Sequence, residues 1–303
     1  MSEYIPIIIP IYIPIVLGFL VRSTGYFEVK HGNSLLQFAL KITVPLLIFT
    51  DMAGMDADAL SQVVPVVLSL PLYMSVLWLA ALLVSRIPLF RRRQVETVLI
   101  IILGNIGYFG WAVCEIGLGS AGLSRSIMYA VLFWPLTILF SFLTKVLLDR
   151  SDEGLASAFY TLKIAIPIFL AFIAGLALAV FGIHAPDFIM EPLAVFGKMT
   201  VPLILFGVGL SLSFKVHWGE LSLLLPLRLI LTFGAAWLIT RLNVKLDDIS
   251  RSAIIMVALM PVAANILMMG NTLKLDEEYL SGAIMLSSLM ALVTIPLTLI
   301  LFS

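Results

Sequence analysis

The chain has 303 residues, of which 61% are hydrophobic and 12% are charged, and its mean hydropathy is +1.13. Soluble domains carry about 25% charged residues, so this composition predicts an all-α polytopic membrane protein embedded in a lipid bilayer. The formal net charge is zero, which leaves no basic footprint for nucleic acid. One cysteine, Cys114, excludes an internal disulfide. Because neither zinc-ligand spacing, a phosphate-binding loop nor a catalytic histidine arrangement is found, we expect no enzyme activity, no cofactor and no resident metal.

Ten apolar runs bounded by polar loops predict ten transmembrane helices. They cover approximately 4–22, 34–54, 63–86, 95–118, 123–148, 160–182, 189–213, 220–241, 252–271 and 279–302. Eleven Lys and Arg residues fall in or beside the loops of one side and four in those of the other, so the first side should be cytoplasmic. An even number of spans then predicts both termini on the non-cytoplasmic side of the cell membrane, which is the inner membrane if the source is bacterial.

The fourth span is interrupted near its centre by Gly104–Gly110, which reads Gly-Asn-Ile-Gly-Tyr-Phe-Gly. Glycine costs about 1 kcal/mol relative to alanine inside a helix, and a buried amide without a partner costs more. Irregular backbone is tolerated at membrane depth only where protein or a water-filled cavity satisfies its polar groups. This break therefore predicts a binding site.

An internal repeat relates the two halves of the chain, 1–150 and 151–303. Lys41–Thr50 and Lys198–Gly207 are identical at six of ten positions, at an offset of 157 residues. The same offset maps Gly104 onto Pro261, which opens Pro-Val-Ala-Ala-Asn in the ninth span. Because each repeat has five spans, the second copy should be inverted relative to the first. Inverted repeats with broken helices are typical of secondary transporters, so we expect the fourth and ninth spans to cross at the midplane.

The predicted substrate site lies at this crossing, where helix N-termini favour anions and freed carbonyls favour cations. Its residues are Asn105, Gly107, Tyr108, Pro261 and Asn265. For Asn105 and Asn265, the alternative is that each only satisfies its own broken backbone.

Four charged residues are further candidates for attracting an anion or for ion coupling: Lys41, Lys198, Glu115 and Arg228. The two lysines occupy equivalent repeat positions and either pair or draw in an anion, or extend to the membrane interface. Arg228 either attracts an anion or contacts a lipid headgroup. Glu115 either carries a proton or is a solvated residue of the outer mouth.

Several motifs resemble those of the auxin efflux carrier family, which includes plant PIN-type carriers and prokaryotic proteins of the malonate-transporter type. Asn-Ile-Gly-Tyr-Phe-Gly at 105–110 is similar to the family element Asn-x-Gly-Phe-x-Gly. Thr200–Leu212, Pro261–Asn265 and Leu292–Leu297 resemble the family's seventh, ninth and tenth spans. The sequence departs from the family at Ala112, where a proline is usual, and the bulky Trp111 precedes it.

The resemblance implies a five-plus-five fold like that of sodium–bile acid symporters. Spans 1, 2, 6 and 7 would form a scaffold that also makes a homodimer contact, and spans 3–5 and 8–10 would form a mobile core. We therefore predict a secondary transporter that moves a small organic anion, such as a carboxylate, by alternating access, with H⁺ or Na⁺ as a candidate coupling ion. The alternatives are a sodium-coupled carrier of bulky amphipathic or neutral substrates and, more remotely, a non-transporting sensor on a transporter fold.

Overall fold

The structure is a computed structural model that describes residues 5–148, 155–211, 218–264 and 266–302. The elements of the first half are α1 (Ile5–Ser23), α2 (Val29–Phe38), the π-helix η1 (Ala39–Thr43), α3 (Val44–Ala53), α4 (Ala57–Val84), the 3₁₀ turn η2 (Pro88–Phe90), α5 (Gln94–Ile102), the π-helix η3 (Ile106–Gly110), α6 (Trp111–Ala130) and α7 (Phe133–Leu148). Those of the second half are α8 (Leu155–Val180), α9 (Asp187–Lys198), α10 (Thr200–Ser211), α11 (Trp218–Leu242), α12 (Asp248–Ala258), α13 (Ile266–Leu273) and α14 (Glu277–Phe302).

Each of the ten predicted spans contains helix, but several are divided into shorter pieces. Within the described residues, five helices are long and apolar enough to cross a membrane, and six if α6 and α7 are taken together as one bent span. The fourth span is split into α5, η3 and α6, and the ninth into α12 and α13. A multi-pass membrane fold is therefore supported, while the complete ten-helix arrangement stays a prediction.

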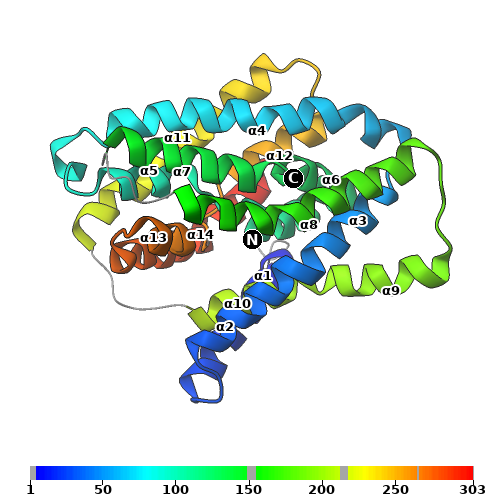
Figure 1. The fold of residues 1–303 in the computed structure, drawn as a ribbon, viewed down its shortest axis with the longest axis horizontal. Coiled ribbons are helices and arrows are strands. Elements are labelled where there is room, and N and C mark those ends of the chain that lie inside the picture. Colours follow the sequence, from blue (N-terminus) through cyan, green and yellow to red (C-terminus); the bar gives the residue numbers. More distant parts are fainter. Residues whose placement is uncertain (1–4, 149–154, 212–217, 265, 303) are drawn as a thin grey trace.

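The helices pack in two groups; in Figure 1, α1, α2 and α10 of the first group lie at the lower edge of the molecule, and α4 of the second lies along its upper edge. In the first group α1 and α2 lie against α10, and α3 lies against α8 and α9. In the second group α4 lies against α5, α6 and α11, and α12 lies between α6 and α11. The first group comprises the spans for which the sequence resemblance implies a scaffold, and the second comprises those for which it implies a core.

Two close helix contacts in the first group are related by the repeat offset. Gly18 on α1 lies against the carbonyl oxygen of Phe206 on α10, so closely that a Cβ would overlap it. Gly175 on α8 lies in the same way against the carbonyl oxygen of Phe49 on α3. Gly18 and Gly175 are 157 residues apart, and so are Phe49 and Phe206. The offset found in the sequence therefore also relates two backbone-to-backbone contacts in space.

Local backbone geometry explains where the fourth span ends and the fifth begins. Gly119 has a φ of +69°, a left-handed conformation that favours glycine, and it kinks α6. Val131 and Leu132 separate α6 from α7, which are bent by 42° at this break. The predicted span boundaries place the first interruption but not the second, although Pro135, which cannot donate a backbone hydrogen bond to the Val131 carbonyl, accounts for it.

Candidate functional site

The broken fourth and ninth spans meet through their main chains. Gly104 and Val262 form an isolated antiparallel bridge. The Asn105 N–H donates to the Pro261 carbonyl oxygen at 2.8 Å, and the Ala263 N–H donates to the Leu103 carbonyl oxygen at 2.9 Å. Each interrupted segment thus satisfies the backbone groups that the other has freed, which is the condition for irregular backbone inside a membrane protein.

Asn105 organises the turn that follows this bridge. It is 3% exposed, and its side-chain Oδ1 accepts a hydrogen bond from the Phe109 N–H at 3.3 Å. Its main-chain oxygen accepts another from the Gly110 N–H at 3.1 Å. These contacts support the structural alternative for Asn105, namely that it satisfies the start of η3.

Arg228 connects the ends of the two half-helices. This side chain comes from α11 and is 1% exposed, so its guanidinium lies inside the protein rather than at a headgroup interface. Its Nε donates to the Ile100 carbonyl oxygen in the last turn of α5, and its Nη1 donates to the Met260 carbonyl oxygen just after α12, both at 2.9 Å. A cation is favourable at these C-terminal ends because helix dipoles make them partially negative.

The third nitrogen of Arg228 has no hydrogen-bond partner in the part of the chain that the structure describes. This buried Nη2 lies close to Gly104, where a Cβ would approach it to 3.0 Å. Gly104 therefore leaves room for the guanidinium at the crossing. A buried donor without a partner is costly, so this position is suited to a negatively charged group.

A small cavity borders the guanidinium. It has a volume of about 10 Å³ and is lined by Arg228, Pro261, Ser287 and Thr294, among others. Ser287 on α14 accepts a hydrogen bond from the Val262 N–H at 3.0 Å and so satisfies another freed backbone group. The volume corresponds to roughly one water molecule, so this cavity does not hold a larger molecule in this conformation.

The other predicted site residues are less directly placed. Pro261 provides both a carbonyl to the bridge and part of the cavity wall. Gly107 lies in η3 against the ring of Trp111, where a Cβ would make only an ordinary contact at 3.7 Å. Tyr108 also lies in η3, but its side chain is outside the described part of the structure, and Asn265 lies outside the described residues altogether.

Three of the four charged candidates make no contact with the residues of the crossing among those that the structure gives. Lys41 in η1 and Lys198 at the end of α9 are both exposed, as is Glu115 on α6. The crossing residues themselves are buried, so among the four charged candidates the structure brings Arg228 alone into this site. Ser287 was missed because a serine in an apolar run carries no signal of the backbone donor that it serves.

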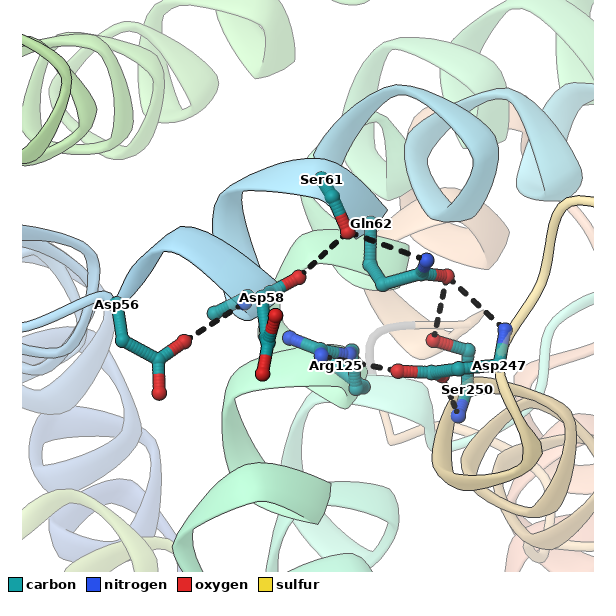
Figure 2. Close-up of polar contacts among 8 residues, drawn as sticks. Asp56, Asp58, Ser61, Gln62, Arg125, Asp247 and Ser250 are labelled. Carbon is teal, nitrogen blue, oxygen red and sulfur yellow. Dashed lines mark hydrogen bonds and ion pairs between the residues drawn. The ribbon is translucent and has the colours of Figure 1, made fainter.

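A polar cluster joins three loops that the sequence predicts on the non-cytoplasmic side (Figure 2). Arg125 on α6 donates through Nη2 to Asp247 Oδ2 at 3.0 Å, and the Asp247 N–H donates to Gln62 Oε1 on α4 at 3.1 Å. Burial tends to raise the pKa of Asp247, but hydrogen bonds from Ser250 and the Arg125 guanidinium outweigh it and hold that pKa below its usual range. A neighbouring cavity of about 750 Å³ includes Arg125 and Asp247 in its wall.

A corresponding cluster joins loops predicted on the cytoplasmic side. Arg93, just before α5, donates to Asp276 Oδ2 at 3.0 and 3.1 Å and to Glu220 Oε2 at 3.3 Å. Its guanidinium also lies over the Tyr279 ring, 4.5 Å from the centroid. The Arg125 cluster links the starts of α4 and α12 to α6. The Arg93 cluster links the starts of α5, α11 and α14. The two clusters therefore hold the core helices together at opposite ends.

The side chains present do not form a metal centre in the described ranges, where no group of three or more His, Cys, Asp or Glu residues is suitably arranged.

Comparison with known proteins identifies the family. The model of the family described as membrane transport protein matches the chain twice, over residues 4–157 and 154–299. The chain belongs to the membrane transport protein family. Two consecutive matches are what a repeated chain should give, and they confirm the resemblance to the auxin efflux carriers that the motifs indicated.

Similar members of the membrane transport protein family come from archaea and bacteria. The chain is 24% identical to an uncharacterized transporter of Methanocaldococcus jannaschii, with 96% of each chain covered. It is 25% identical to an uncharacterized transporter of Methanothermobacter thermautotrophicus, with 96% of this chain and 95% of the relative covered. It is 21% identical to a Rhizobium meliloti protein named "Putative malonate transporter", with 97% and 94% covered.

Proposed function

We propose that this member of the membrane transport protein family is a secondary transporter of a small organic anion, which binds where the two broken spans cross. The observation that carries the proposal is the guanidinium of Arg228, buried at the crossing with Nη2 unpartnered among the described residues. An anionic oxygen on this nitrogen would provide its missing partner and offset the buried charge.

A carboxylate is the favoured class of anion. Its oxygens suit the planar donors of a guanidinium, and the relative from Rhizobium meliloti carries malonate in its name. The site has room for a substrate only after the helices move, because the cavity beside Arg228 is about 10 Å³. Because every residue that lines this cavity belongs to the second helix group, α11 and α14 must separate within that group to admit a substrate. Movement of the group relative to the first would then expose the crossing to one side at a time, which is alternating access.

The Arg228 contacts favour an organic anion over the sodium-coupled alternative. Freed carbonyls at the C-terminal ends of half-helices are the groups that commonly coordinate Na⁺ in broken-helix transporters. Here the carbonyls of Ile100 and Met260 already accept hydrogen bonds from a fixed cation. A sodium ion at these two oxygens would lie beside that positive charge, so we expect coupling to H⁺, or none, rather than to Na⁺.

The proposal includes an orientation and an assembly. The excess of Lys and Arg in one set of loops favours cytoplasmic placement of Arg93 and its cluster, with both termini on the other side of the cell membrane. The first helix group exposes large apolar side chains such as Leu17, Leu20 and Ile173, which supports contact with lipid or a homodimer through this group.

The experiment is counterflow in proteoliposomes loaded with unlabelled carboxylates. We expect exchange of labelled mono- or dicarboxylate, little effect of a Na⁺ gradient, and reduced exchange for Asn105→Ala, which loses the cap of η3. If no carboxylate is exchanged, or a Na⁺ gradient is required for uptake of a neutral amphipathic compound, the anion proposal is wrong. If Asn105→Ala exchanges as fast as the wild type, transport does not depend on the Asn105 cap of η3.

A further inference from the structure

A basic loop at residues 85–93 connects α4 to α5 at the end of a lipid-facing helix. Leu79 and Leu83, in the last turns of α4, are 58% and 71% exposed, which is expected of side chains that face lipid. The three arginines Arg86, Arg91 and Arg92 follow within the loop, and all are exposed. These arginines therefore extend from the protein at the level where α4 reaches the membrane surface.

The basic loop is held in one conformation by contacts of its own. Phe90 is 1% exposed and anchors the η2 turn in the protein, while its N–H donates to the Ile87 carbonyl oxygen at 2.9 Å. Gln94 Nε2 donates to the Ser85 carbonyl oxygen at 3.1 Å and closes the loop. A preformed loop loses little conformational freedom when it binds a partner.

The arginines of this segment divide into two kinds. Arg93 points into the protein and is neutralised by Asp276 and Glu220. Arg86, Arg91 and Arg92 form no ion pair within the described ranges of the chain. Ile87 and Leu89, which lie between Arg86 and Arg91 in the sequence, are 42% and 43% exposed.

We infer that the basic loop binds the headgroups of anionic phospholipids, with Ile87 and Leu89 in contact with the acyl region just beneath. Exposed arginines that form no ion pair with the described residues, next to exposed apolar side chains, match a surface that is negatively charged outside and apolar inside. A soluble anion would satisfy the arginines but would leave the two apolar side chains in water. A phospholipid satisfies both, so the lipid surface is the partner that this loop fits.

The position of the loop gives this contact a structural role. The loop leads directly into α5, whose last turn provides the Ile100 carbonyl oxygen to Arg228. Lipid bound at the loop would therefore hold the first half-helix of the crossing at a fixed depth. This inference concerns lipid recognition alone and does not depend on which substrate the crossing binds.

The test measures lipid preference at the loop in reconstituted full-length protein. Leu89→Trp places a fluorescent reporter there, and quenching by brominated phosphatidylglycerol is compared with quenching by brominated phosphatidylcholine, after subtraction of the signal of the parent protein. Each arginine near an anionic surface contributes about a fivefold preference. We expect a preference of at least tenfold for phosphatidylglycerol over phosphatidylcholine. This preference should fall to near unity in Arg86→Gln/Arg91→Gln/Arg92→Gln. It should not change in Lys245→Gln, whose exposed lysine lies in a loop predicted on the opposite side of the membrane.

Three results would overturn the inference. The first is equal quenching of the Leu89→Trp reporter by the two lipids, in protein that unfolds at the same thermal midpoint as its parent. The second is a phosphatidylglycerol preference that survives in the triple variant. The third is abolition of the preference by millimolar inorganic phosphate at constant ionic strength, because this would make the loop a site for soluble anions.

Discussion

Replacing Gly104 with alanine should displace the guanidinium at the crossing. The added Cβ would be 3.0 Å from Arg228 Nη2, closer than ordinary contacts allow, and Gly104 does not have the positive φ that would strain an alanine backbone. The guanidinium must therefore move by a few tenths of an ångström from its two 2.9 Å hydrogen bonds. A hydrogen bond to a charged group contributes about 1.5–3 kcal/mol, and overpacking costs about 1–3 kcal/mol. We expect a loss of about 2 kcal/mol of stability and, because the methyl group also covers Nη2, a fall of about tenfold or more in kcat/KM for anion flux.

Two assays distinguish this steric effect from a general effect of alanine. Thermal unfolding in detergent reports stability, and initial rates of counterflow report transport. The matched control is Gly234→Ala, on the same helix as Arg228, where a Cβ would meet nothing within 4 Å. The control should be neutral or stabilising by about 0.5–1 kcal/mol. Wild-type stability and flux in Gly104→Ala would refute the close approach of Gly104 to the guanidinium.

Two further substitutions test the contacts around the crossing and at the loop cluster. Ser287→Ala leaves the Val262 N–H without its acceptor and should cost about 1–3 kcal/mol in thermal unfolding. Ser288→Ala removes a hydroxyl that has no hydrogen-bond partner among the described residues and should cost nothing, so equal effects of the two substitutions would contradict this. Asp247→Asn should lower the melting midpoint at pH 7, because the ionised Asp247 carboxylate pairs with Arg125. The pKa of Asp247 in the folded protein is below its usual value of 3.8. The difference in melting midpoint between Asp247→Asn and the wild type should therefore persist above pH 3.8 and shrink as the pH falls through the lower, folded-state pKa. A difference that is unchanged at pH 3 would argue against the ion pair with Arg125.

The internal repeat could be recognised from the sequence because the two halves have identical residues at equivalent positions. The offset of 157 residues that aligns Lys41 with Lys198 also aligns Gly18 with Gly175, and the structure shows why both positions are glycine: each lies against a backbone carbonyl of another helix. The interruption at Gly104 was equally visible, since glycine and asparagine are unfavourable in an apolar helix. The bend at Val131 also had a signal, Pro135, which cannot donate a backbone hydrogen bond to the Val131 carbonyl, but the prediction of one continuous apolar span passed over it.

The crossing of the two broken segments was predictable in position, but its contacts were not. Pro261 and Asn105 marked the crossing, yet both take part in it largely through their backbone groups. The sequence could not decide whether Arg228 meets lipid or an anion, because its position 128 residues from Ile100 gives no sign that the two touch. Lys41 and Lys198 show the reverse case: their equivalence in the repeat is evident, but both side chains are exposed on the first helix group. Contacts between distant segments decide such cases, and one sequence contains no record of them.

Counterflow of a labelled carboxylate by the wild type, Arg228→Lys and Arg228→Gln tests the central claim most directly. The account predicts exchange by the wild type, weaker exchange by Arg228→Lys, which keeps the charge without the planar donors, and a loss of at least a hundredfold in Arg228→Gln, with protein of each variant shown to be folded by its melting transition. Carboxylate exchange at the wild-type rate by folded Arg228→Gln would show that the anion does not bind at this guanidinium.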